Sequence, residues 1–288
     1  ITGALTLAGG TQMVINSNTT TTPSSWNVNS AILSGADILI GGSNGAGNPR
    51  SALTIGAGGL TMTGRTITMN VGNAGVALNL NGDFTGTGTN NIVTGGSGGV
   101  TPIIDLGSAM RTFDVMSGTT TLGAEVTGLG GIAKAGEGLL QITSASTYSG
   151  ATTVTSGTLS VAAAAGRLLN TANLSVSDGG TLQDGSPSAA NNSGVSNRIN
   201  TAASLAMGSA TGGGTFILST AASGGTHTQD LASVSINGGA NTVSVLADAG
   251  ATSTLTFTSA SPYNHTAGSV NFLQNPGVGG SIVLLNAP

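Results

Sequence analysis

The chain has 288 residues, of which 49 are glycine, none is cysteine and only 6% are charged, against roughly 25% in a typical soluble domain. This composition is atypical of an enzyme, and the lack of cysteine excludes disulfides, thiolate catalysis and cysteine-ligated metals. Ten acidic and six dispersed basic residues give a net charge of −4, so nucleic-acid binding is not expected.

Pairs of apolar residues separated by one position recur along the whole chain, a pattern typical of short, half-buried strands. Turn-forming segments rich in glycine, asparagine and aspartate separate them, as at residues 81–83, 178–180 and 237–239. In chain order the pairs include Leu5 and Leu7, Met13 and Ile15, Ile38 and Ile40, Leu53 and Ile55, Leu78 and Leu80, Phe113 and Val115, Leu140 and Ile142, Leu159 and Val161, Leu174 and Val176, Phe216 and Leu218, Val243 and Val245, and Leu255 and Phe257.

These strands predict an all-β fold with a narrow core, because only 3% of residues are aromatic. A parallel β-helix (β-solenoid) of about a dozen short coils, each of roughly 20–25 residues, fits best. We expect a single elongated solenoid over residues 1–288, with a subdivision near 162–200 as an open alternative. The alanine run at 162–165 is expected to form at most one helical turn, and no apolar stretch is long enough for a membrane helix.

One stretch carries a specific motif: GGIAKAGEGLLQI at 130–142, followed by TYSGATTVTSGTL at 147–159. It resembles the passenger-associated transport repeat, also called the autotransporter-associated β-strand repeat, which reads GGLTKxGxGTLxL and then NTYxGxTxVxxGTL. The best match spans residues 128–161. More loosely, residues 197–199, 214–216 and 238–243 are similar to spacer regions of long bacterial surface proteins. The resemblance implies a β-helical passenger, secreted by or attached to a bacterium, expected to be Gram-negative.

Coil stacking makes residues one coil apart into neighbours, so Asp83 with Asp105 and Asp114 with Glu137 are candidate carboxylate pairs for glycoside hydrolysis. A groove lined by such a pair beside Trp26 or Tyr263 would indicate a carbohydrate-active enzyme. Arg111 and Lys134 have the same spacing as Asp114 and Glu137. The favoured interpretation is therefore a solvated ladder of ion pairs on one face, formed by Arg111, Asp114, Lys134 and Glu137.

For the other motifs we favour interpretations without a catalytic or ligand-binding role. The G-x-S-x-G strings at 41–45 and 95–99 are read as loops, since no helix pattern follows them. The segment 128–133 matches a loose dinucleotide fingerprint but lacks its β-α-β context. His227 and His265 have no cluster of acidic residues near them in the sequence, and the expected contact of His227 is a local hydrogen bond with Asp230. The sequence also contains no calcium-binding nonapeptide. We therefore predict no catalytic residue, cofactor or metal. Glycosylation signals occur at Asn18, Asn173, Asn191 and Asn264.

The leading functional hypothesis is a structural extracellular protein that assembles head to tail into a surface fibre. The reason is that the apolar end strands of a solenoid must be covered by a cap or paired with strands of another subunit. Its expected partners are further copies of itself and, in second place, a cell-surface polysaccharide. The alternatives are an adhesin passenger domain and, less favoured, the enzyme described above. Since the chain begins at Ile1 without an export signal, that signal is expected to be removed or upstream. The predicted interface residues are Ile1, Leu5, Leu7, Ile282, Val283, Leu284 and Leu285.

Overall fold

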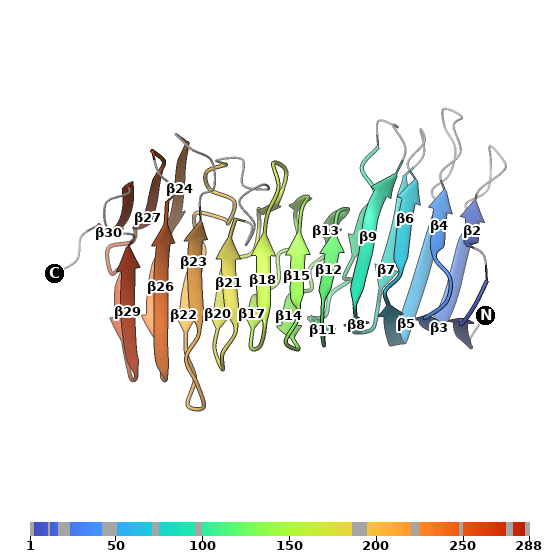
Figure 1. The fold of residues 1–288 in the computed structure, drawn as a ribbon, viewed down its shortest axis with the longest axis horizontal. Helices are drawn as coiled ribbons and strands as arrows, with labels where there is room; N and C mark the ends of the chain where they lie inside the picture. The colour runs from blue at the N-terminus through green and yellow to red at the C-terminus, as the bar shows by residue number, and fades with distance from the viewer. Residues whose placement is uncertain are drawn as a thin grey trace.

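The computed structural model describes residues 3–10, 12–16, 24–41, 51–70, 75–95, 100–185, 195–219, 225–247, 250–274 and 279–285. Within these residues all regular structure is β, and neighbouring strands pair in parallel. Figure 1 shows the strands side by side across the long axis, with the N-terminal strands at one end and the C-terminal strands at the other. The prediction of an all-β parallel solenoid is confirmed.

The strands form two long sheets and two small ones. The 14-stranded sheet contains β1 (Ala4–Leu7), β3 (Ser25–Leu33), β5 (Ser51–Thr63), β7 (Val76–Leu80), β8 (Phe84–Thr87), β10 (Ile103–Asp105), β11 (Arg111–Val115), β13 (Glu125–Thr127), β14 (Ile132–Ala135), β17 (Thr152–Val154), β20 (Asn173–Val176), β22 (Ser204–Met207), β25 (Ser233–Ile236) and β28 (Tyr263–His265). The 11-stranded sheet contains β2 (Met13–Asn16), β4 (Ile38–Gly41), β6 (Thr66–Asn70), β9 (Thr89–Gly95), β12 (Thr119–Leu122), β15 (Leu139–Ile142), β18 (Thr158–Val161), β21 (Thr181–Asp184), β23 (Thr215–Ser219), β26 (Ala240–Leu246) and β29 (Ser269–Gln274). The small sheets are β16 (Ala145–Ser146) with β19 (Arg167–Leu168), and β24 (Thr226–Leu231) with β27 (Thr252–Phe257) and β30 (Gly279–Leu284).

The strand order gives the coils three faces. The first half of β5 pairs with β7, whereas its second half pairs with β8, so the 14-stranded sheet divides at β5 into two faces. One of these faces continues through β11, β14 and β17; the other contains β7, β10 and β13 and is extended by the small sheets. This third face is interrupted between β19 and β24, where an isolated bridge joins Leu168 to Ile199.

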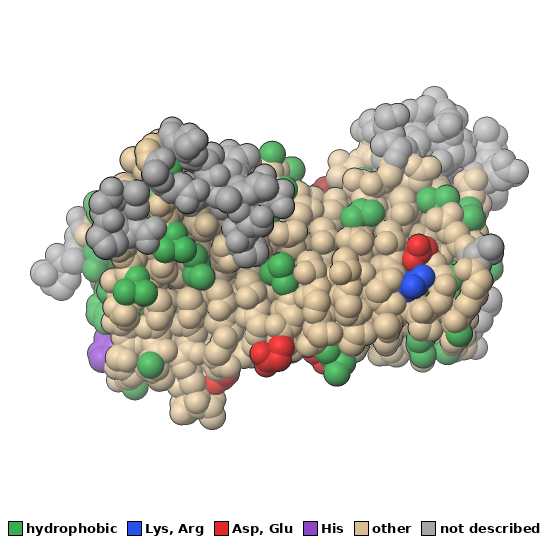
Figure 2. All heavy atoms as spheres, viewed as in Figure 1, with side chains coloured by type: hydrophobic (Ala, Val, Ile, Leu, Met, Phe, Trp, Pro, Cys, Tyr) green, Lys and Arg blue, Asp and Glu red, His purple; other side chains and the backbone are tan. Residues whose placement is uncertain are grey.

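The core consists of columns of side chains in register from coil to coil. Along one inward column of the 11-stranded sheet, Leu122 lies opposite Ile142, which lies opposite Val161. Burial alternates along many of the strands, for example β12 and β15, as the period of two predicts. Figure 2 shows few charged side chains on the face in view, most of which is formed by backbone and by side chains that are neither charged nor hydrophobic.

Coil length varies more than expected. Val161 follows its column neighbour Ile142 by 19 residues, whereas Leu218 follows Asp184 by 34. The expected helical turn at 162–165 is a plain turn, with Ala163 at a φ of 62°. Among the described residues no helix is long and apolar enough to cross a membrane.

Candidate functional site

The predicted solvated ion-pair ladder is wrong, because Lys134 points into the core. Its side chain has no exposed surface, and the strand register places Lys134 opposite Phe113, an offset of 21 residues rather than the assumed 23. Arg111 consequently lies opposite Ile132, and Asp114 opposite Ala135. The ion pairs found among the described residues involve other side chains.

Lys134 instead closes the turn after β14. Its Nζ donates hydrogen bonds to the carbonyl oxygens of Ala135 and Gly136, both at 2.6 Å, and of Ser156 at 3.2 Å. Burial lowers the pKa of Lys134 to about 8, while the charges of Asp114 and Glu137 act in the opposite direction. A buried ammonium group that has three carbonyl partners stabilises the junction between two coils.

The strand register does not place the members of either candidate carboxylate pair opposite each other. Asp83 accepts a hydrogen bond from the Thr112 backbone at 2.8 Å, while Asp105 accepts one from Gly107 and lies opposite Asn79 in the sheet. Asp114 lies opposite Ala135, and Glu137 accepts a hydrogen bond from Ser156 at 2.8 Å. Trp26 and Tyr263, the predicted aromatic partners, lie on β3 and β28, at opposite ends of the 14-stranded sheet.

The remaining motifs fall into turns, strands or undescribed segments. The first G-x-S-x-G string lies almost entirely outside the described residues, and so does the second after Gly95. Segment 128–133 leads into strand β14, not into a helix. Asn173 and Asn264 are exposed on β20 and β28, whereas Asn18 and Asn191 lie outside the described residues. His265 is exposed and stacks on Tyr263 with ring centroids 6.4 Å apart.

Five of the seven predicted interface residues lie on the edge strands β1 and β30. Leu5 and Leu7 on β1 and Ile282 and Leu284 on β30 are partly buried against the core. Val283 lies between them on β30, Leu285 is 45% exposed, and Ile1 lies outside the described residues. Their role in association stays a prediction.

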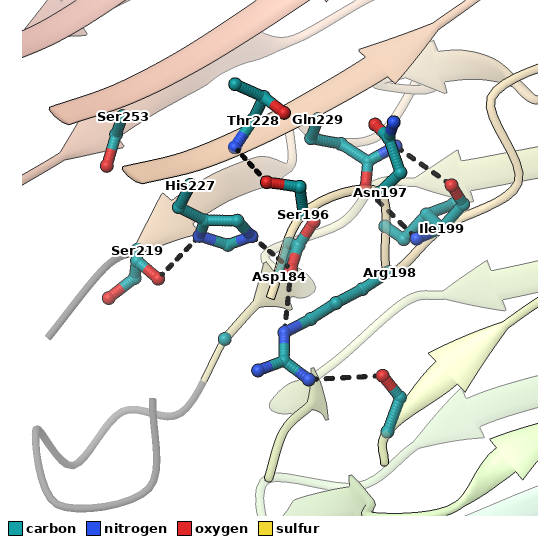
Figure 3. A network of polar contacts seen from close by, with 12 residues as sticks. Asp184, Ser196, Asn197, Arg198, Ile199, Ser219, His227, Thr228, Gln229 and Ser253 are labelled. Carbon is teal, nitrogen blue, oxygen red and sulfur yellow. Dashed lines mark hydrogen bonds and ion pairs between the residues drawn. The ribbon is translucent and has the colours of Figure 1, made fainter. Parts of the chain in front are cut away.

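A buried ion cluster of Asp184, Arg198 and His227 was missed by the sequence analysis (Figure 3). His227 Nε2 lies 3.3 Å and Arg198 Nε 3.6 Å from the same carboxylate oxygen, Oδ1 of Asp184. All three side chains are at most 2% exposed. The partner of His227 is thus Asp184, not the expected Asp230, which lies on the outward-facing side of β24.

Asp184 occupies a position that the fold reserves for aliphatic side chains. In the inward column of the 11-stranded sheet it lies between Val161 and Leu218. Burying a carboxylate there requires a compensating charge, which the Arg198 guanidinium supplies, while the His227 ring lies 3.3 Å from the same carboxylate oxygen. The local pattern Leu182-x-Asp184, compared with Leu159-x-Val161, was the signal in the sequence that could have revealed it.

Hydrogen bonds hold Arg198 and the backbone beside it in place. Arg198 donates to the carbonyl oxygens of Ala163 and, at 3.1 Å, of Gly166. Burial lowers the pKa of Arg198, and the charge of Asp184 opposes this effect. Gln229 fixes the adjoining backbone by bonding both the N–H and the carbonyl of Ile199, at 3.0 and 2.9 Å.

The cluster is not arranged for nucleophilic catalysis or metal binding. In a serine–histidine–aspartate relay, one ring nitrogen bonds the carboxylate and the other faces the nucleophile. Here the other nitrogen, Nδ1 of His227, lies 3.1 Å from the backbone carbonyl of Ser219. In the part of the chain that the structure describes, no group of three or more histidine, cysteine, aspartate or glutamate residues is placed to hold a metal. The geometry indicates a structural ion cluster.

Comparison with known proteins identifies the central coils. Residues 132–161, from β14 to the end of β18, match the family model of the passenger-associated-transport-repeat. A 58-residue stretch is 48% identical to the adhesin BmaC autotransporter of Brucella suis, covering 20% of this chain and 2% of that protein. No solved structure matches. Within this parallel β-solenoid, the coils formed by residues 132–161 are therefore similar to a passenger-associated-transport-repeat.

Proposed function

We propose that the chain is a stalk segment of an adhesin passenger, secreted and exposed at the surface of a Gram-negative bacterium. The observation that carries the proposal is the continuous parallel pairing from β2 to β29, with the passenger-associated repeat in its middle. The similarity to an autotransporter adhesin supports the same setting, although the chain spans only 2% of that relative.

The physical argument for a stalk is that stacked coils form a stiff spacer. Eleven strands leave ten spacings of about 4.8 Å, so the 11-stranded sheet extends about 48 Å along the solenoid axis. Each coil is held by its two neighbours through backbone hydrogen bonds and the continuous core. Such a segment keeps whatever lies beyond it at a distance from the cell surface.

A surface-display experiment tests this proposal. The chain is inserted between an outer-membrane anchor and a short epitope tag, in a Gram-negative host with full-length lipopolysaccharide. Capture of the cells on immobilised antibody is then compared with capture of cells that carry the tag on the anchor alone. We expect the solenoid to raise capture, and a Gly157→Ala variant, which disturbs coil stacking, to reduce it. Equal capture with and without the solenoid contradicts a stalk role.

End-to-end association is a second candidate, favoured by the open edges of the stack. Among the described residues β1 pairs with β3 alone and β2 with β4 alone, while β29 and β30 each pair on one side. Tyr263, Phe272 and Leu273 are exposed near the C-terminal edge. Unpaired parallel edges above a partly open core are surfaces onto which a second copy can stack.

Light scattering and electron microscopy of the purified chain test this second candidate. We expect concentration-dependent rods or filaments, and we expect deletion of residues 1–8 to leave folded monomers. Leu129→Ser serves as the matched control, because Leu129 is 74% exposed but lies in the central coils. Filaments that persist after the deletion, or a wild-type chain that stays monomeric at all concentrations, contradict head-to-tail assembly.

A further inference from the structure

The strands of the 11-stranded sheet present no charged side chain to the outside. Among their described residues only Asp184 on β21 is charged, and its side chain is buried in the inward column. Strands of the other faces do carry outward acids, such as Asp114 on β11, Asp105 on β10 and Asp230 on β24. Strand propensity favours threonine on the outer side of any sheet, but it does not remove charge from one sheet alone.

A column of threonine side chains runs along this outer surface, and we call it the threonine column. The hydroxyl groups of Thr119, Thr158 and Thr181 in this column have no hydrogen-bond partner in the described part of the chain. By contrast, Thr226 and Thr252 on the third face bond to each other at 3.1 Å. From β9 to β29 the register gives the column as Thr89, Thr119, Leu139, Thr158, Thr181, Thr215, Thr242 and Asn271, all exposed or half-buried.

A second outward column widens this surface over part of its length. Beside the threonine column, half-buried uncharged side chains continue from β6 to β15, whereas the later members of the second column are buried. The open members are Thr66, Asn91, Thr121 and Gln141, and the buried ones include Ser160, Gln183 and Ser244. We call the threonine column and the four open members of the second column the uncharged face; Figure 2 views the molecule from this side.

We propose that the uncharged face is a lateral docking surface for a second copy of this chain, so that two solenoids pack side by side. Hydroxyl and amide groups both donate and accept hydrogen bonds, so two identical faces built from them are complementary to each other. An isologous contact requires such self-complementarity, whereas a face with charges of one sign repels its own copy. Both stacks repeat every ~4.8 Å, which keeps two such columns in register over many coils.

The size of the sheet sets the strength expected of this contact. About four residues of each strand cross the sheet over about 13 Å, so its length of about 48 Å gives at most about 600 Å² per copy. Two copies then bury up to about 1,200 Å², the lower end for a stable interface. Leu139 and Ile217 add half-buried apolar surface to the sheet. A single contact is therefore weak, and many copies on one surface strengthen it through avidity.

This contact is separate from the end-to-end association proposed above, because it uses the side of the stack and not the edge strands. It depends on the parallel register alone, so its failure would leave the stalk and end-to-end proposals open. If the chain is a stalk, lateral contacts would join stalks on one cell or on two facing cells.

Beads that carry many copies of the intact chain through a terminal biotin test the proposal. We expect wild-type beads to cluster in buffer of low ionic strength. The triple variant Thr119→Glu, Thr158→Glu, Thr215→Glu places like charges two coils apart on the threonine column and should reduce clustering to the level of bare beads. The same three positions changed to lysine should reduce it equally. Mixing the glutamate beads with the lysine beads should restore clustering, because opposite charges then face each other.

A matched control places the same charges on another face. Ala133→Glu, Ser175→Glu, Ser235→Glu has the same two-coil spacing on the outer side of the face that contains β14, and its beads should cluster like the wild type. Circular dichroism checks folding, and the single pair Thr158→Glu and Thr158→Lys repeats the mixing comparison if a triple variant does not fold.

Four results would overturn lateral docking: wild-type beads that stay dispersed, glutamate beads that cluster like the wild type, mixed beads that cluster no more than either kind alone, or control beads that disperse like the glutamate beads. Deletion of residues 1–8 should leave clustering unchanged. Clustering that is lost in this deletion but kept in the glutamate variant assigns association to the ends of the stack and overturns the proposal. Clustering that requires added dextran assigns the face to a neutral polysaccharide instead.

Discussion

Replacing Gly157 by alanine tests whether glycine in the repeat is required by close coil stacking. Gly157 connects β17 and β18 with a φ of +58°. A Cβ added there would lie 2.4 Å from the Gly136 carbonyl oxygen and 2.5 Å from that of Gly138, so the backbone must move. The left-handed conformation itself costs an alanine about 1–2 kcal/mol. Movement also weakens two inter-coil hydrogen bonds, Thr158 N–H to Gly138 at 3.2 Å and Thr181 N–H to Gly157 at 2.9 Å, each contributing about 1 kcal/mol.

The expected loss in the free energy of unfolding is therefore about 3–4 kcal/mol for Gly157→Ala. Gly64→Ala is a matched control, because Gly64 has a φ of +59° but no heavy atom within 4 Å of the added Cβ, so about 1–2 kcal/mol is expected. Urea unfolding followed by circular dichroism gives the totals. Hydrogen exchange over 152–161 localises the effect, since a solenoid need not unfold in one step. Equal losses in the two variants would refute the stacking argument.

Three other substitutions probe the core. Lys134→Met leaves three backbone carbonyls without their donor and should cost about 2–4 kcal/mol at pH 7 in urea unfolding. Because burial lowers the pKa of Lys134 to about 8 in the folded chain, unfolding takes up a proton between there and about 10.5, so wild-type stability should rise with pH across this window relative to Lys134→Met. Tyr148→Phe removes a 2.7 Å hydrogen bond to Thr152 and should cost about 1 kcal/mol. Burial raises the pKa of Tyr148, so in an absorbance titration this side chain should not ionise while the chain stays folded. Phe84→Ala should cost about 3–5 kcal/mol in thermal or urea unfolding.

The fold was predictable because its signals are local. Alternating pairs such as Leu140 with Ile142 and Leu159 with Val161 identify strands, and glycines mark the turns between them. The alternating burial that the structure shows in β15 follows directly from such a pair. The scarcity of aromatic residues predicted the narrow core of a parallel solenoid, and the resemblance to the passenger-associated repeat implied the same fold.

The register was not predictable because coil length is set by the turns. The assumed offset of 23 residues would pair Lys134 with Arg111, whereas the true offset of 21 places it opposite Phe113 in the core. A shift of two residues alters which side chains are neighbours. The ion cluster could not be predicted from short sequence patterns either. His227 follows Asp184 by 43 residues, and the longest described coil lies between them.

The ion cluster also predicts that Asp184 is harder to replace alone than together with its partners. Asp184→Leu restores the aliphatic column between Val161 and Leu218, yet it leaves the Arg198 guanidinium and the His227 ring in the core without their carboxylate partner and should cost about 3–5 kcal/mol. Replacing Arg198 and His227 by apolar residues at the same time removes that cost, so the triple variant should be about as stable as the wild type or more so. Urea unfolding at pH 7 measures both. If the single and triple variants lose the same free energy, the carboxylate contributes by packing alone. If only the single variant is destabilised, the three residues form one electrostatic unit, and it can be removed only as a whole.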